Sequence, residues 1–121
     1  AACRKQGGAA AQIASTLSPE PSHYFILKPK HSAFLATPLP VLLAKLQVRR
    51  VVLAGMALDS CVLATALDAN SREYETVIAW EATAALPDRR QPALQLLQRS
   101  DAAKVLDNRE VIALLDDTEG E

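Results

Sequence analysis

The chain has 121 residues, of which 50% are hydrophobic and 22% are charged, and its formal net charge is −1. A chain of this length forms one domain at most and is long enough to bury a real core. Its composition argues against a disordered chain and against a nucleic-acid-binding surface, which requires a strongly basic balance.

Signals for membrane insertion or secretion are not evident in the sequence. No window approaches the roughly 20 continuous apolar residues that a membrane span requires, and the opening AACRKQGGAAAQ lacks the apolar region of a signal peptide. The two cysteines, Cys3 and Cys61, are far apart and lack metal-type spacing, which favours a reducing compartment over a disulfide scaffold. We therefore expect a cytoplasmic globular protein with no membrane or nucleic-acid partner.

The first part of the chain is expected to contain one strand and one helix. Residues 1–20 are rich in small and polar residues and predict a weak helix or a linker. YFILK at 24–28 is an apolar run between two prolines and predicts a buried strand. PLPVLLAKLQV at 38–48 has leucines at helical spacing and predicts a helix, with Thr37 as the candidate N-cap.

The rest of the chain continues this alternation. RRVVLAG at 49–55 predicts a second strand, and the next helix is expected to run from Asp59 as N-cap to about Arg72. Asp107 and Glu110 have the spacing of a capping box at the start of the last helix. The other expected elements are a strand at 74–80, a helix at 89–100, a strand at 102–106 and a helix at 107–117.

This order, βαβαβαβα with short connections, predicts a three-layer α/β fold with a mostly parallel sheet. The apolar runs are continuous rather than alternating, as in parallel strands that are covered on both faces. Ligands of such sheets gather at the carboxyl ends of the strands. Lys28 and the turn GMALDSC at 55–61 are both expected at that edge.

Cys61 is the candidate nucleophile. If the helix begins near Asp59, the thiol lies in its first turn, where free backbone N–H groups and the helix dipole stabilise a thiolate. From position alone, the alternative is a small apolar side chain packed in the core.

Lys28 ends the predicted strand at the same edge, and an ammonium near a thiol favours the thiolate. Lys30 competes for this role. Backbone N–H groups around Met56 and Ala57, together with that of Cys61, are candidates for an oxyanion hole, which stabilises a tetrahedral intermediate. An ordinary strand-to-helix turn is the alternative for this segment.

No cofactor is expected. The sequence has no phosphate-binding glycine loop and no GxSxG elbow. His23 and His31 lie on different elements, so no zinc site is predicted within the chain. His31 and Phe34, in the loop after Lys28, are candidate residues for binding a small-molecule substrate.

Three segments in order resemble the isochorismatase-like cysteine hydrolases, which include nicotinamidases and N-carbamoylsarcosine amidase. The segments are LKPKHSAFLATPL at 27–39, RRVVLAGMALDSCVLATALDA at 49–69 and YETVIAWEATAA at 74–85. The resemblance covers residues 20–106 and implies the Rossmann-like fold of that superfamily. Because relatives are often dimers or larger, it also implies a homo-oligomer as one possible assembly.

The resemblance implies roles for individual residues. It selects Lys28 over Lys30 as the catalytic lysine and Cys61 as the nucleophile. It places a cis peptide between Met56 and Ala57, with the N–H groups of Ala57 and Cys61 as the oxyanion hole. In the family mechanism an aspartate acts as general base toward the thiol, the thiolate attacks a carbonyl, and water hydrolyses the acyl-enzyme.

The sequence departs from the family pattern at three places. The family aspartate follows an opening apolar strand, and nothing before Tyr24 is apolar enough to be that strand. Leu58 stands where relatives usually have a threonine or similar residue, and Glu81 stands where they have an aspartate. We therefore expect a single, N-terminally incomplete domain over residues 1–121.

The sequence is compatible with two different functions. The first is a cysteine hydrolase that acts on the amide bond of a small molecule through an acyl-enzyme. The second is a catalytically inactive remnant or interaction module of the same fold that lacks the general base. A vinyl-ether hydrolase is disfavoured, because relatives with that activity commonly lack the cysteine.

Overall fold

The computed structural model describes residues 7–119. Its sheet has three parallel strands in the order β1–β2–β3, with bounds β1 (Arg50–Met56), β2 (Glu75–Ala84) and β3 (Lys104–Leu106). The helical elements are α2 (Gly8–Thr16), α3 (Leu39–Lys45), a π-helical turn η1 (Leu58–Val62), α4 (Leu63–Ser71), α5 (Pro87–Arg99) and α6 (Asn108–Glu119). The α/β class and the parallel sheet agree with the prediction from the sequence.

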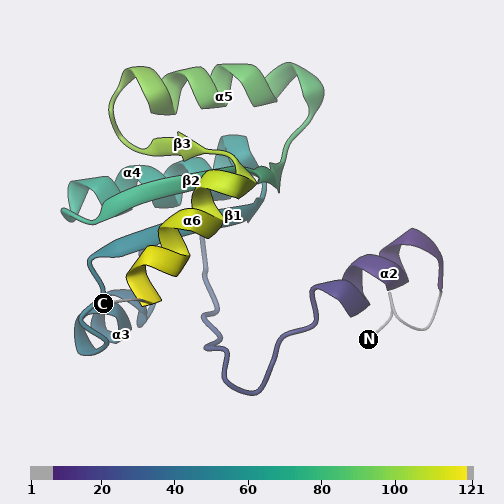
Figure 1. Cartoon of the computed structure of the whole chain (residues 1–121), viewed down its shortest axis with the longest axis horizontal. Coiled ribbons are helices and arrows are strands. Elements are labelled where there is room, and N and C mark those ends of the chain that lie inside the picture. Colours follow the sequence, from purple (N-terminus) through teal and green to yellow (C-terminus); the bar gives the residue numbers. More distant parts are fainter. Residues whose placement is uncertain (1–6, 120–121) are drawn as a thin grey trace.

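Helices cover both faces of the sheet. Figure 1 shows α6 crossing one face, while α4 and α5 lie on the other side of the strands. Successive residues of β2 point to opposite faces, so Ile78 belongs to one core and Val77 to the other. The first core joins Ile78 to Leu58, Val62, Ala66, Ala93, Leu94, Leu97 and Ala102, and the second joins Val77 and Ala79 to Val111.

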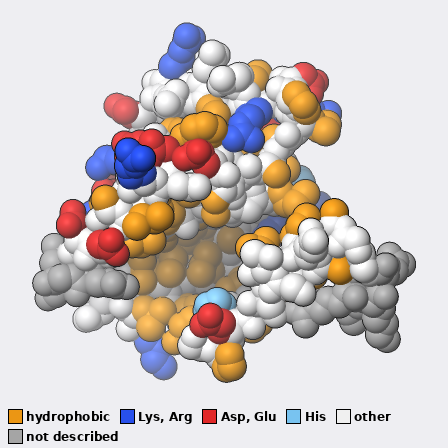
Figure 2. All heavy atoms as spheres, turned by 45° about the vertical axis from the view of Figure 1, so that its right-hand side comes forward, with side chains coloured by type: hydrophobic (Ala, Val, Ile, Leu, Met, Phe, Trp, Pro, Cys, Tyr) orange, Lys and Arg blue, Asp and Glu red, His pale blue; other side chains and the backbone are white. Residues whose placement is uncertain are grey.

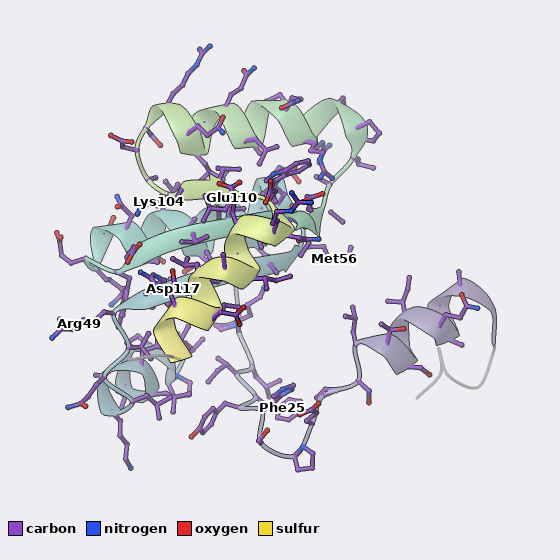
Figure 3. All side chains as sticks on the ribbon, viewed as in Figure 1. Phe25, Arg49, Met56, Lys104, Glu110 and Asp117 are labelled. Atoms are coloured by element: carbon purple, nitrogen blue, oxygen red, sulfur yellow. The ribbon has the colours of Figure 1, made fainter. Side chains whose placement is uncertain are left out.

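The strand predicted at residues 24–28 is wrong. The segment is irregular and pairs with no strand among residues 7–119. Phe25 and Leu27 are 72% and 92% exposed, and Figure 3 shows Phe25 on the connecting segment, away from the sheet. An apolar run becomes a strand only where a neighbouring strand takes up its backbone hydrogen bonds and a packed layer covers its side chains. Neither is present here, and the sheet has three strands instead of four.

Two predicted helix starts also differ from the structure. Pro38, and not Thr37, is the residue before α3, although the Thr37 hydroxyl accepts a 3.2 Å hydrogen bond from the Leu39 N–H. Asp59 is not an N-cap, because the helical backbone already begins at Leu58. The side chain of Leu58 is fully buried in the core, so the first residue of the turn packs against the sheet and α5.

The start of α6 confirms the predicted capping box. The backbone N–H of Asp107 donates to the Glu110 carboxylate at 3.1 Å, and the N–H of Glu110 donates to the Asp107 carboxylate at 2.8 Å. The expected weak helix near the N-terminus corresponds to α2, which buries no residue. Figure 1 shows α2 standing apart from the sheet at the end of a long connection.

Figure 2 shows hydrophobic side chains gathered in a hollow between the body that carries the sheet and the N-terminal segment. None of the helices described between residues 7 and 119 is long and apolar enough to cross a membrane.

Candidate active site

The turn after β1 brings Cys61 to the carboxyl edge of the sheet. Gly55 has φ +109, a conformation that side-chain-bearing residues rarely adopt. The next peptide bond, between Met56 and Ala57, is cis, at the position that the family resemblance implied. The Ala57 carbonyl accepts hydrogen bonds from the N–H groups of Ser60 and Val62, both at 3.1 Å. These bonds close the turn tightly and leave Cys61 within η1 rather than in an α-helical first turn.

Lys28, and not Lys30, meets the thiol. The Lys28 Nζ lies 3.2 Å from the Cys61 Sγ and 3.3 Å from the Lys30 backbone oxygen, and it donates to both. Two acceptors therefore fix the direction of the ammonium. Lys30 contributes its carbonyl to this arrangement, so the two lysines that compete in the sequence have different places in the structure.

His31 also lies beside the sulfur, with its Nδ1 3.8 Å from the Cys61 Sγ. The hydrogen bond with His31, followed by that with Lys28, lowers the pKa of the Cys61 thiol to about 7, and Ser60 adds a smaller contribution. Partial burial of the thiol opposes these effects. The lowered pKa increases the share of the thiolate, which is the nucleophilic form of cysteine.

A set of hydrogen bonds holds the loop of Lys28 and His31 against α4. The Ser32 hydroxyl donates to the Asp68 carboxylate at 2.5 Å, and the Ala33 N–H donates to the Thr65 hydroxyl at 3.0 Å. Thr65 and Asp68 are three residues apart and therefore lie on one face of the helix. None of these four residues is predicted as a site residue from the sequence, although all of them stand in the segments that carry the family resemblance.

Phe34 is 3% exposed and anchors the same loop. Its ring stacks on Tyr74 with a centroid distance of 5.8 Å, and the guanidinium of Arg72 lies 5.1 Å from its centroid. These contacts give Phe34 a packing role, and its contact with a substrate stays a prediction. Met56 is 76% exposed. Figure 3 shows it at the end of β1.

The two substitutions relative to the family pattern have local structural explanations. Leu58 lies in the core between the sheet and α5, where an apolar side chain is well accommodated. The Glu81 carboxylate accepts a 2.8 Å hydrogen bond from the backbone N–H of Asn108 and so helps to start α6. Neither residue contacts the thiol through a hydrogen bond.

Within residues 7–119, no carboxylate is hydrogen-bonded to the Cys61 sulfur, and no group of three or more His, Cys, Asp and Glu side chains is arranged to hold a metal ion. Cys3 lies outside the described residues. A cavity of about 800 Å³ lies at the other end of the sheet, beside the first residues of β1 and β2, and is separate from the thiol.

Fold and turn together define a parallel α/β domain in which a cysteine lies beside a lysine and a histidine, just after the carboxyl end of the first described strand. The Isochorismatase domain model matches residues 1–110, so the chain belongs to the isochorismatase family.

The relatives fit this assignment. The isochorismatase family protein YaaI of Bacillus subtilis is 38% identical over 101 residues, which cover 83% of this chain and 56% of YaaI. An isochorismatase-like hydrolase from Alkaliphilus metalliredigens superposes with a TM-score of 0.76 at 29% identity, over 82% of this chain and 55% of that one. N-carbamoylsarcosine amidase from Thermoplasma acidophilum superposes with a TM-score of 0.68 at 31% identity, over 74% of this chain and 50% of that one. The chain thus spans about half the length of these relatives.

Proposed function

We propose that this chain carries the nucleophile of a cysteine hydrolase that cleaves the amide bond of a small molecule. The observation that carries the proposal is the 3.2 Å hydrogen bond from the Lys28 ammonium to the Cys61 sulfur, beside the cis-peptide turn at the end of β1. Membership of the family, in which one structural relative is named an N-carbamoylsarcosine amidase, supports the reaction class.

In the proposed reaction the Cys61 thiolate attacks the amide carbonyl carbon and forms a C–S bond. The developing oxyanion is stabilised by the backbone N–H groups of Ala57 and Cys61. The C–N bond then breaks, the amine leaves with a proton, and a thioester remains on Cys61. Water adds to the thioester and releases the acid, which restores the thiol.

Lys28 has an electrostatic role in this proposal. Its ammonium stabilises the thiolate before attack, and the hydrogen bond to the Lys30 carbonyl keeps it beside the sulfur. An ammonium has no lone pair, so in this state it donates a hydrogen bond and accepts no proton.

The second candidate is an inactive remnant or interaction module with the same fold. The specific observation in its favour is that no carboxylate among residues 7–119 is hydrogen-bonded to the Cys61 sulfur, whereas the family mechanism uses an aspartate there. A reactive but non-catalytic thiol would then be retained as part of the fold.

Acylation of Cys61 separates the two candidates. A Cys3→Ser chain is mixed with p-nitrophenyl acetate, and the acetyl adduct is followed by intact mass. A hydrolase forms the adduct at Cys61 and releases it with turnover, and Lys28→Gln slows its formation. If the adduct forms no faster than on a free thiol of ordinary pKa, or forms and is never released, the inactive candidate is correct.

A further inference from the structure

The side of α5 that faces away from the core has no role in the proposed reaction. Figure 1 shows α5 on the side of the molecule opposite to α3 and to the N-terminal segment. The helix buries Ala93, Leu94 and Leu97 against the sheet and η1. Because an α-helix repeats every 3.6 residues, a second set of positions points in the opposite direction, away from the core.

Four exposed residues form this outer face of α5: Asp88, Pro92, Gln95 and Arg99. They are spaced by four, three and four residues, so they lie on one stripe along the helix. Asp88 is in the first turn and Arg99 is in the last. The stripe therefore carries a negative charge at one end and a positive charge at the other, about 16 Å apart at 1.5 Å per residue.

The other two charged residues of α5 already have partners within the chain. The Arg89 guanidinium lies 3.7 Å from the Asp59 carboxylate. Arg90 donates to the Trp80 carbonyl at 3.3 Å, and its guanidinium lies 5.2 Å from the centroid of the Trp80 ring. Among residues 7–119, Asp88 and Arg99 form no ion pair. These two charges are therefore available for a contact with another molecule.

Exposed apolar side chains lie beside the stripe. Leu96 is 51% exposed, and with Leu63, Pro92 and Ala93 it lines a pocket of about 360 Å³ between α5 and the start of α4. Leu86, the residue before α5, is 58% exposed. Apolar side chains with charges at their margin are typical of a surface that contacts another protein.

We propose that the outer face of α5 binds the same face of a second copy of this chain, with the two helices antiparallel about a twofold axis. Asp88 of each copy then lies opposite Arg99 of the other copy. The midpoint between Asp88 and Arg99 is also the midpoint between Pro92 and Gln95, so one twofold axis relates both pairs of positions. This contact is independent of the proposed chemistry at Cys61.

The charge pattern favours a second copy over other occupants. A nucleic acid or an acidic membrane surface would be attracted by Arg99 but repelled by Asp88. If two copies packed with parallel helices, like charges would meet at both ends. The antiparallel pair is attractive at both ends. Because one helix pair buries less area than a standard interface, we expect a dimer that dissociates in the micromolar range.

Charge-reversed variants test this pairing. Sedimentation equilibrium of the Cys3→Ser chain measures the dissociation constant of the dimer for Asp88→Arg, for Arg99→Asp and for an equal mixture of the two. Each single variant places like charges at both ends of its own antiparallel pair. In the mixture, the two different chains offer opposite charges to each other at both ends. Ile112→Arg is the matched control, because Ile112 is 59% exposed on α6, on the other face of the sheet.

We expect each single variant to raise the dissociation constant by at least about tenfold. The mixture should associate about as tightly as the parent chain, and Ile112→Arg should keep the parent value. Asp88 and Arg99 also stabilise α5 itself through the helix dipole. A weakened helix would affect the mixture as much as the single variants, so recovery in the mixture identifies the contact between copies.

Three outcomes overturn the proposal. If the parent chain stays monomeric up to millimolar concentration, the outer face of α5 does not bind a second copy. If the parent dimerises and the single variants dimerise equally well, another surface forms the dimer. If the mixture is as weak as the single variants, Asp88 and Arg99 do not meet across the interface. None of these outcomes concerns the acylation of Cys61, so the proposed function stands or fails separately.

Discussion

The Ser32 hydroxyl lies 2.5 Å from the Asp68 carboxylate and donates a hydrogen bond to it across 36 positions of the sequence. The same hydroxyl accepts a hydrogen bond from the Phe34 N–H at 3.1 Å. Through Ser32 the helix that follows Cys61 therefore fixes the loop that supplies Lys28 and His31. The distance from both side chains to the sulfur depends on this attachment.

Ser32→Ala should weaken both the fold and the thiol site. The change removes the donor from a part-buried carboxylate, so we expect a loss of about 1–2 kcal/mol in the free energy of unfolding. It should also raise the midpoint of Cys61 alkylation, because Lys28 and His31 are then less well held near the sulfur. Urea unfolding and the alkylation profile measure the two effects.

Ser100→Ala is the matched control for that experiment. The Ser100 hydroxyl donates to the Leu96 carbonyl at 2.7 Å at the end of α5, away from the loop. This variant should leave the alkylation midpoint unchanged whatever it does to stability. An unchanged midpoint in Ser32→Ala as well would show that the loop keeps its place without the contact to Asp68.

The two lysines of the loop should differ in their effect on the thiol. Hydrogen bonds with His31 and then Lys28 lower the pKa of Cys61 to about 7, so the alkylation rate of the parent chain should rise as the pH passes through about 7. Lys28→Gln removes a charged donor at 3.2 Å and should move this rise to higher pH. Lys30→Gln retains the backbone carbonyl that holds Lys28 and should not move it. Equal profiles for the two variants would contradict the assigned geometry.

Local patterns predicted the elements that depend on local interactions. The strands at β1 and β2 follow from continuous apolar runs, and the start of α6 follows from Asp107 and Glu110, which lie three residues apart. The local patterns place Lys28 near Cys61 through a strand at 24–28 that the structure does not have, and the ordered motifs of the family select Lys28 over Lys30.

Contacts between distant parts of the sequence account for the features that were not predicted. Apolar content alone does not determine whether residues 24–28 have a strand beside them. The start of η1 depends on the burial of Leu58 against α5, and the attachment of the loop depends on Asp68. Each of these contacts forms only after the chain has folded, so single-sequence patterns do not contain them.

The capping interactions of α6 should contribute measurably to stability. Asp107→Ala removes an acceptor from the Glu110 N–H, and we expect a loss of about 1 kcal/mol. Asp116→Ala, near the other end of the helix, removes a negative charge from the carboxyl end and should be neutral or slightly stabilising. Thermal unfolding of the two variants should therefore change in different directions or by clearly different amounts. Equal losses would contradict a specific contribution of the Asp107 cap to the stability of α6.

Leu58→Thr should destabilise the fold although it introduces the residue type that relatives usually have. Leu58 is fully buried between η1, the sheet and α5. A threonine leaves a cavity and places a hydroxyl among apolar side chains, so we expect a loss of about 2–4 kcal/mol. Leu67→Thr is the control, because Leu67 is 42% exposed on α4 and the same change there should cost less than about 1 kcal/mol. Urea unfolding gives both values. A small loss at Leu58 would mean that the hydroxyl finds a partner in the turn, and in that case the alkylation profile of Cys61, three residues away, should change with it.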